Sequence, residues 1–308
     1  MINKNEKLGI VAALIANLLF GFSNYFSAIA LRHAPPLVIL SIRFTLAFLI
    51  LSLLWALKII KLKYRGKKKG ILILMCIAQP LVYFYCELYG IEMTSSSLSG
   101  VMISLVPVAA ILLSVIFLRE RPKFLQLLFM AISLFGVILI NVFADDVGSV
   151  QTKGIILLVG AIIAAAVFNV LSKRLSKGFS PIERTYFMFV IGSIGFNLIA
   201  IGKYGVSFFP MVVSAFSSVE FIYSILYLSV GSSILAYFLY NYSTSKISIV
   251  KASSFANIIP IAAILAGVFI LGEPFNFIQA ICSVLIILGV CGVNVLHTGK
   301  KINPKALA

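Results

Sequence analysis

Charged residues are scarce in this sequence of 308 residues: they make up 11% of it, against 61% hydrophobic residues and a mean hydropathy of +1.12. A soluble globular domain carries about 25% charged residues, so this composition excludes one. No Ser/Gly-rich stretch or charge block is long enough to mark off a separate soluble domain. We therefore expect a membrane domain that takes up the whole chain.

Residues that build metal and nucleotide sites are also few. The four cysteines lie inside apolar runs and form no CxxC pair; they are Cys76, Cys86, Cys282 and Cys291. The two histidines, His33 and His297, are far from any Cys/His cluster. No GxxxxGK[ST] phosphate loop occurs, which disfavours an ATP-driven pump. We predict no metal site and no cofactor, and we interpret the cysteines as small apolar packing residues.

Long apolar runs, by contrast, fill the chain. A helix that crosses the hydrocarbon core needs about 20 apolar residues. Ten such runs occur, near residues 8–31, 36–57, 70–91, 96–118, 123–143, 154–172, 181–202, 219–242, 250–271 and 276–297. The runs are continuous rather than alternating, so the predicted fold is an all-α integral membrane protein with ten transmembrane helices.

Positive charge is distributed unevenly between the loops. With a cytoplasmic N-terminus, the cytoplasmic segments hold 20 of the 25 Lys and Arg residues and the outer loops hold three. This bias predicts a multi-pass protein of the cell membrane with both termini in the cytoplasm. It also accounts for the net charge of +16 without a nucleic-acid partner. The basic stretch from Lys58 to Lys69 is either a topogenic loop that rests on anionic lipid or a docking site for a partner.

The two halves of the chain resemble each other. Matched Pro, Glu and Asn residues are hard to explain by lipid-like composition alone. A shift of 153 residues pairs Pro107 with Pro260 and Glu120 with Glu273, and a shift of 145 pairs Asn24 with Asn169 and Pro36 with Pro181. We predict two five-helix repeats, at residues 1–148 and 149–308. Because five is odd, the second repeat is inverted, an arrangement that underlies alternating access in many secondary transporters.

Several short motifs strengthen this interpretation. They are Phe20-Gly21, Ile42-Arg43-Phe44, Pro107 followed by Leu118-Arg119-Glu120-Arg121, and Pro260 followed by Leu271-Gly272-Glu273-Pro274. With ten spans and the repeat, the chain resembles the EamA family of the drug/metabolite transporter superfamily over nearly its full length. The resemblance implies export or exchange of small metabolites, often amino acids or amphipathic compounds, by secondary transport. The sequence departs from the common family pattern in having Phe20 where tryptophan is frequent.

Polar residues within the spans are candidates for contact with a solute, since a polar group in lipid must face protein or a cavity. They form stripes on spans one, three and eight and a matched pair on spans four and nine. The candidates are Asn24, Gln79, Tyr83, Glu87, Ser104, Tyr237, Tyr240 and Asn257. A cavity between spans one, three, four, six, eight and nine would collect them all. The alternative for each residue is an interhelical hydrogen bond.

Two further residue pairs have open interpretations. Pro107 and Pro260 lie mid-span, where each removes a backbone donor, and they predict either paired bends that gate the cavity or static kinks. Glu120 and Glu273 precede spans five and ten, and a carboxylate is favoured at a helix N-terminus. We therefore interpret both glutamates as structural.

Arg43 and Glu87 are charges well inside spans two and three, at the same depth from the outer face. One interpretation is a structural ion pair that braces adjacent helices. The other is that Glu87 takes up a proton or a cationic group of the solute, with Arg43 keeping it ionised until then. Protons are thus one candidate for the coupling ion.

The expected function is secondary transport of a small metabolite through one central site, without enzymatic activity and without an obligate protein partner. The alternative from another class is a polytopic membrane enzyme that acts on lipid-like substrates. Such an enzyme would normally cluster His, Asp or Glu, or a Ser/His pair, near one membrane face. Here both histidines are isolated, and Glu87 is the only carboxylate deep in a span.

Overall fold

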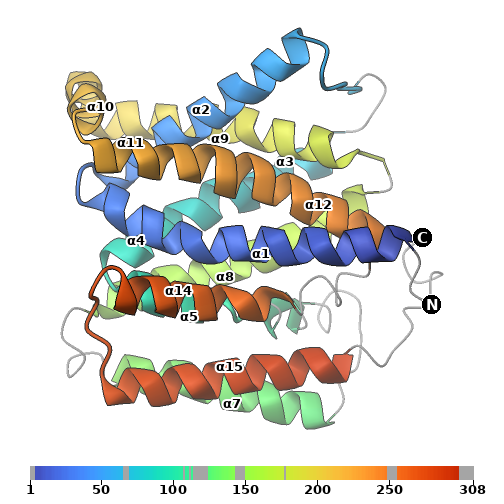
Figure 1. Cartoon of the computed structure of the whole chain (residues 1–308), viewed down its shortest axis with the longest axis vertical. Helices are drawn as coiled ribbons and strands as arrows, with labels where there is room; N and C mark the ends of the chain where they lie inside the picture. The colour runs from blue at the N-terminus through green and yellow to red at the C-terminus, as the bar shows by residue number, and fades with distance from the viewer. Residues whose placement is uncertain are drawn as a thin grey trace.

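The computed structural model describes residues 4–64, 69–106, 108–110, 112–113, 124–142, 150–176, 178–247 and 255–297. Over these residues the chain is helical and contains no strand (Figure 1). Pro107, Glu120 and the predicted repeat boundary between residues 148 and 149 lie outside this part.

The helices follow the predicted apolar runs closely. In chain order they are α1 (Lys4–Leu31), α2 (Pro36–Ala56), α3 (Gly70–Cys76), α4 (Tyr83–Glu92), α5 (Ser96–Ile103), α7 (Phe124–Val142), α8 (Thr152–Leu175), α9 (Pro181–Tyr204), α10 (Phe208–Ala215), α11 (Val219–Leu226), α12 (Ala236–Lys246), α14 (Ile258–Phe269) and α15 (Phe277–His297). A π-helical segment η1 (Ile77–Val82) joins α3 to α4, and a second, η4 (Tyr227–Leu235), joins α11 to α12. Short 3₁₀ turns, η3 (Gly205–Ser207) and η5 (Phe255–Asn257), precede α10 and α14.

Six helical stretches in the described residues are long and apolar enough to cross a membrane. They are Glu6–Leu31, Pro36–Ala56, Gly70–Glu92, Thr152–Ser172, Pro181–Ala215 and Val219–Lys246. Four further apolar helices are shorter within the described residues: Ser96–Ala110, Leu127–Gly136, Ile258–Phe269 and Phe277–Gly292. The protein is therefore a multi-pass membrane protein, and the part of the chain that the structure describes spans the membrane as helices.

Both the outer surface and the interior of the helix bundle are apolar. Large side chains such as Ile156, Leu198 and Val213 are about two-thirds exposed, at 65%, 66% and 71%. Helices that are hydrophobic all round require an apolar solvent on the side away from the core. These side chains therefore face lipid.

Two long helices begin at proline, whose missing N–H costs nothing at the first helical position. Pro36 starts α2 and Pro181 starts α9. At α9 the Ser180 hydroxyl accepts the backbone N–H of Glu183, and the Glu183 carboxylate accepts the backbone N–H of Ser180. This reciprocal capping satisfies donors that a helix start would otherwise leave unpaired.

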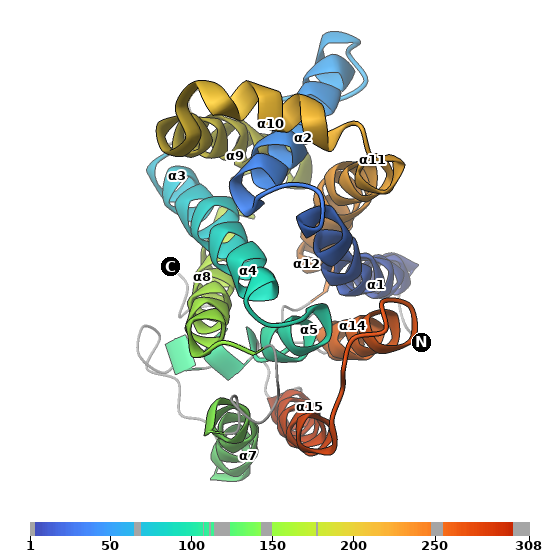
Figure 2. The same cartoon turned by 90° about the vertical axis from the view of Figure 1, so that its left-hand side faces the viewer.

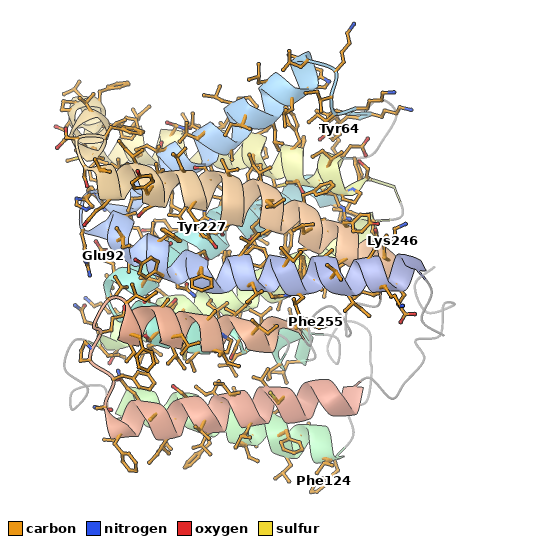
Figure 3. All side chains as sticks on the ribbon, viewed as in Figure 1. Tyr64, Glu92, Phe124, Tyr227, Lys246 and Phe255 are labelled. Atoms are coloured by element: carbon orange, nitrogen blue, oxygen red, sulfur yellow. The ribbon has the colours of Figure 1, made fainter. Side chains whose placement is uncertain are left out.

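The long helices run alongside one another, and Figure 2 shows most of them end-on. α1 packs against α12 and α14, α2 against α9, α4 against α8, and α5 against α14. α7 and α15 form a separate pair at one edge of the bundle (Figures 1 and 2). α1 begins at the face where α15 ends (Figure 1). Tyr64 and Lys246 also lie toward that face, and Glu92 lies at the opposite one (Figure 3).

Small residues allow α5 to approach α14 very closely. A Cβ atom at Gly100 would lie 2.1 Å from the Ala263 Cβ. A side chain at this position would force the two helices apart, so glycine is required. The contact brings α5 of the first half beside α14 of the second half.

Glu273 caps a different helix from the one expected. Its carboxylate accepts hydrogen bonds from the start of α5, at Ser96 and Ser97. The start of α15 is instead capped by Asn276, whose side chain accepts the Gln279 N–H at 2.8 Å while the Gln279 side chain accepts the Asn276 N–H at 3.1 Å. Glu273 thus has a structural role, as we interpret it from the sequence. The helix that it stabilises is α5, which is distant from it in the sequence.

Candidate functional site

A cavity of about 90 Å³ lies in the centre of the bundle. Its lining comes from α1, η1, α4, α5, α8, η4, α12, η5 and α14, together with Val106. These elements belong to the six spans between which the sequence predicts a cavity. Helices from both halves of the chain therefore enclose one space.

Six of the eight candidate residues line this cavity: Asn24, Gln79, Tyr83, Glu87, Tyr237 and Tyr240. Ser104 is buried but lies outside the lining, and its hydroxyl donates to the Val101 carbonyl oxygen at 2.6 Å. The backbone of Asn257 lies in η5, and its side chain is outside the described part. Pro260 is buried within α14.

Hydrogen bonds connect the polar groups of the cavity in pairs. The Tyr83 hydroxyl donates to Glu87 Oε1 at 2.6 Å, one helical turn along α4. The Gln79 amide donates to the Tyr237 hydroxyl, which joins η1 to α12. The Tyr240 hydroxyl donates to Asn169 Oδ1 at 3.3 Å, which joins α12 to α8. These bonds fix the side chains around the cavity wall.

A break in the third membrane stretch positions the Gln79 side chain. Gln79 has non-helical backbone angles, with φ −146° and ψ 114°, and Pro80 follows it. Pro80 lacks a backbone N–H and disfavours helical angles at the residue before it, so the helical segments on either side of Gln79 meet at a kink. Neither π-helical segment was foreseen from the sequence.

Arg43 reaches the cavity only indirectly. It is 2% exposed, and its Nε donates to Ser233 Oγ at 2.8 Å while its Nη2 donates to Ser232 Oγ at 3.1 Å. Its guanidinium carbon lies 4.3 Å from the Phe84 ring centroid. Among the contacts between described residues, Arg43 and Glu87 form no salt bridge. Ser232 lies between Arg43 and the cavity, and it was absent from the candidates because a single serine is a weak signal.

Aromatic rings complete the cavity wall, and Tyr237 is at their centre. Its ring centroid lies 4.9 Å from that of Phe20 and 6.1 Å from those of Phe84 and Phe168. All four rings line the cavity. Edge-to-face packing of this kind favours a rigid wall, since ring pairs are most stable in such geometry. Phe168 was not among the candidates, because an apolar ring in a span carries no signal of function.

A second buried arginine lies outside the cavity. Arg184 Nη1 donates to the Ser172 hydroxyl at 2.6 Å and to the Ser172 carbonyl oxygen at 2.9 Å. Its Nη2 donates to the Asn241 carbonyl oxygen at 3.4 Å. Arg184 thereby ties α9 to α8 and α12. No group of three His, Cys, Asp or Glu residues in the described chain lies close enough to hold a metal ion.

Comparison with known proteins gives the context of this cavity. The model of the EamA-like transporter family matches residues 7–142 and again residues 152–295. An uncharacterized transporter of Bacillus subtilis, YcxC, is 30% identical over 302 residues, which cover 96% of this chain and 95% of that protein. An uncharacterized transporter of Archaeoglobus fulgidus is 29% identical, covering 85% of this chain and 89% of that protein. One solved crystal structure aligns with a TM-score of 0.65 at 15% identity, over 95% of this chain and 99% of that chain.

Proposed function

Because the chain belongs to the EamA-like transporter family of the drug/metabolite transporter superfamily, and is a membrane transporter, we propose that it moves a small metabolite through the central cavity by alternating access. The observation that carries this proposal is the cavity itself. It lies between helices of both halves, and polar and aromatic side chains line it within an apolar bundle. A central site at the interface of two halves is what alternating access requires.

The architecture we propose is ten transmembrane helices in two inverted repeats, at residues 1–148 and 149–308, with both termini in the cytoplasm. Six long and four shorter apolar helices support the count. The family model matches the chain twice in succession, which supports the duplication. A π-helical segment interrupts the corresponding membrane stretch of each half, at η1 and η4. The positive-inside distribution supports the orientation.

The solute class we propose is an amino acid or a related amphipathic compound, moved by export or exchange. The cavity offers a carboxylate and amides beside aromatic rings, so it suits a molecule with one polar and one apolar end. Glu87 is the candidate for binding a proton or a cationic group of the solute. The names of the relatives describe transporters and favour this function over a membrane enzyme.

The test is flux through proteoliposomes that contain the purified chain alone. Solutes are first chosen by comparing metabolite pools inside cells and in the medium, with and without the protein. Flux should be lost or altered in specificity by Tyr237→Ala, in the cavity wall, and retained by Met130→Ala, which is buried in α7 away from the cavity. Equal loss of flux and of folded protein in both variants would count against a transport site at the cavity.

A further inference from the structure

Several hydrogen-bond donors of the cavity lining are bonded to other protein groups. Tyr83, Gln79 and Tyr240 each donate to another residue of the wall. Two more lining residues bond within α1: Asn17 Nδ2 donates to a backbone carbonyl at 2.7 Å, and the Ser23 hydroxyl donates to another at 2.6 Å. A solute that accepts hydrogen bonds would compete with the present partners of these five donors.

An acceptor, in contrast, is left over. Asn24 is 2% exposed, lines the cavity, and its Oδ1 atom has no hydrogen-bond partner in the described structure. A buried carbonyl oxygen without a donor is unfavourable, and each such group calls for an explanation. A ligand that brings an N–H group into the cavity would supply the missing donor.

Charge in the cavity points the same way. Glu87 is 6% exposed, and Oε1 accepts one neutral hydroxyl. Of the described residues that line the cavity, none is Lys, Arg or His. Arg43 is nearby, but its Nε and Nη2 are bonded to serines, and it does not line the space. A buried carboxylate is stabilised most by a cation that also donates hydrogen bonds to it.

The aromatic rings that line the same cavity as Glu87 suit the remainder of such a ligand. Phe20, Phe168 and Tyr237 offer apolar area, and ring faces attract a cation. A carboxylate on the solute would instead meet the charge of Glu87 without a basic partner in the lining. The cavity thus favours a positive, donor-bearing head and an apolar body over an anion.

We infer that the cavity selects a protonated primary amine with an aromatic or other apolar body. Its ammonium group donates to Glu87 and to Asn24 Oδ1, and its body packs against the rings of Phe20, Phe168 and Tyr237. This inference rests on the proposed function, because it names the solute class of the same cavity. The inference names a narrower class of solute, since the proposed function also admits zwitterions and neutral amphipathic compounds.

The experiment is calorimetric titration of the detergent-solubilised full chain with three probes of matched size: benzylamine, benzyl alcohol and benzoate. Benzylamine should bind at least tenfold more tightly than either of the others. Glu87→Gln should weaken benzylamine binding about tenfold or more, because it removes a charge-assisted hydrogen bond. Asn24→Leu should weaken it several-fold and leave the charge in place.

The matched control is Glu220→Gln, which changes an exposed glutamate paired with His33 and should not affect binding. Benzyl alcohol or benzoate binding as tightly as benzylamine would overturn the inference, as would unchanged benzylamine affinity in Glu87→Gln. If Glu87→Gln does not fold, as judged by thermal unfolding, unchanged affinity in Asn24→Leu overturns it instead.

The binding assay does not depend on transport, so the amine site and the transport function can be refuted independently. Benzylamine binding that depends on Glu87, without flux of any solute in proteoliposomes, supports the amine site and contradicts the transport proposal. Flux of a solute that benzylamine neither competes with nor resembles contradicts the amine site and leaves transport supported.

Discussion

Replacing Glu273 by glutamine should destabilise the junction between α5 and the segment before α15. Glu273 Oε1 accepts the Ser96 backbone N–H at 2.9 Å and the Ser96 hydroxyl at 2.7 Å. Oε2 accepts the Ser97 backbone N–H at 3.0 Å and the Ser97 hydroxyl at 2.6 Å. Glutamine keeps one accepting oxygen, so one of the two backbone N–H groups loses its partner. The hydroxyl beside the new amide can rotate and accept from it.

The expected loss in the free energy of unfolding follows from the hydrogen bond and the charge that the substitution removes. One lost hydrogen bond to a charged group costs about 1.5–3 kcal/mol. Removing a negative charge from a helix start costs about 0.3–1 kcal/mol more. Because Glu273 is partly exposed, water replaces some of the lost interaction, and we expect a decrease of about 2 kcal/mol in the free energy of unfolding. For a chain of 308 residues, this corresponds to about 3 °C in the unfolding midpoint.

The assay is thermal unfolding followed by circular dichroism in one detergent at one scan rate, since unfolding of such proteins is often irreversible. The control is Glu220→Gln, because Glu220 is 68% exposed and pairs with His33 at 3.1 Å. An exposed pair contributes less than about 1 kcal/mol. A shift for Glu273→Gln no larger than for this control would show that the four hydrogen bonds contribute little.

Three further predictions concern topology and packing. Cysteines placed at Glu120 and Glu273, on a background without native cysteines, should be labelled by an impermeant thiol reagent from opposite sides of the membrane; labelling of both from outside would exclude inverted repeats. Arg43→Gln and Glu87→Gln should each lower the unfolding midpoint, and the double variant should lose less than the sum of the two, because the two buried charges attract each other without forming a salt bridge; a loss equal to the sum would show that they act independently. Gly289→Ala should lower the free energy of unfolding by about 1–3 kcal/mol in the same assay, since a Cβ at this position in α15 would lie 2.6 Å from a backbone oxygen of α7. An unchanged unfolding midpoint would show that α7 and α15 move apart at no cost.

Helix positions were the most predictable part of the structure. The run predicted at 36–57 is α2 at Pro36–Ala56, and the run predicted at 70–91 is the stretch Gly70–Glu92. Each boundary is set locally, by proline, serine or a charged loop next to twenty apolar residues. The break at Gln79 was missed because Pro80 in an apolar run indicates a bend without indicating its form.

The cavity could be predicted in outline, because a polar side chain within a span must face protein or a cavity rather than lipid. Six candidates line it, whereas Ser104 satisfies its hydroxyl within its own helix. A serine can bond to the carbonyl three or four residues before it, so its presence in a span is a weak signal. The partners of Glu273 could not be predicted for the opposite reason. They lie up to 177 residues away in the sequence, whereas the start of α15 is only a few residues away.

Charge alone misleads about the partners of buried arginines. Sequence position gives the depth of Arg43 and Glu87 but not the direction in which each side chain points around its helix, so pairing them by sign was the natural hypothesis. In the structure Arg43 bonds to serine hydroxyls, and Arg184 bonds to one serine and to backbone carbonyls. Neutral oxygens therefore accept the guanidinium hydrogen bonds of both arginines, although Arg184 Nε has no hydrogen-bond partner among the described residues. Glu87 therefore lines the cavity without a salt bridge to Arg43 among the described contacts, and this arrangement supports the inferred preference for a cationic head group.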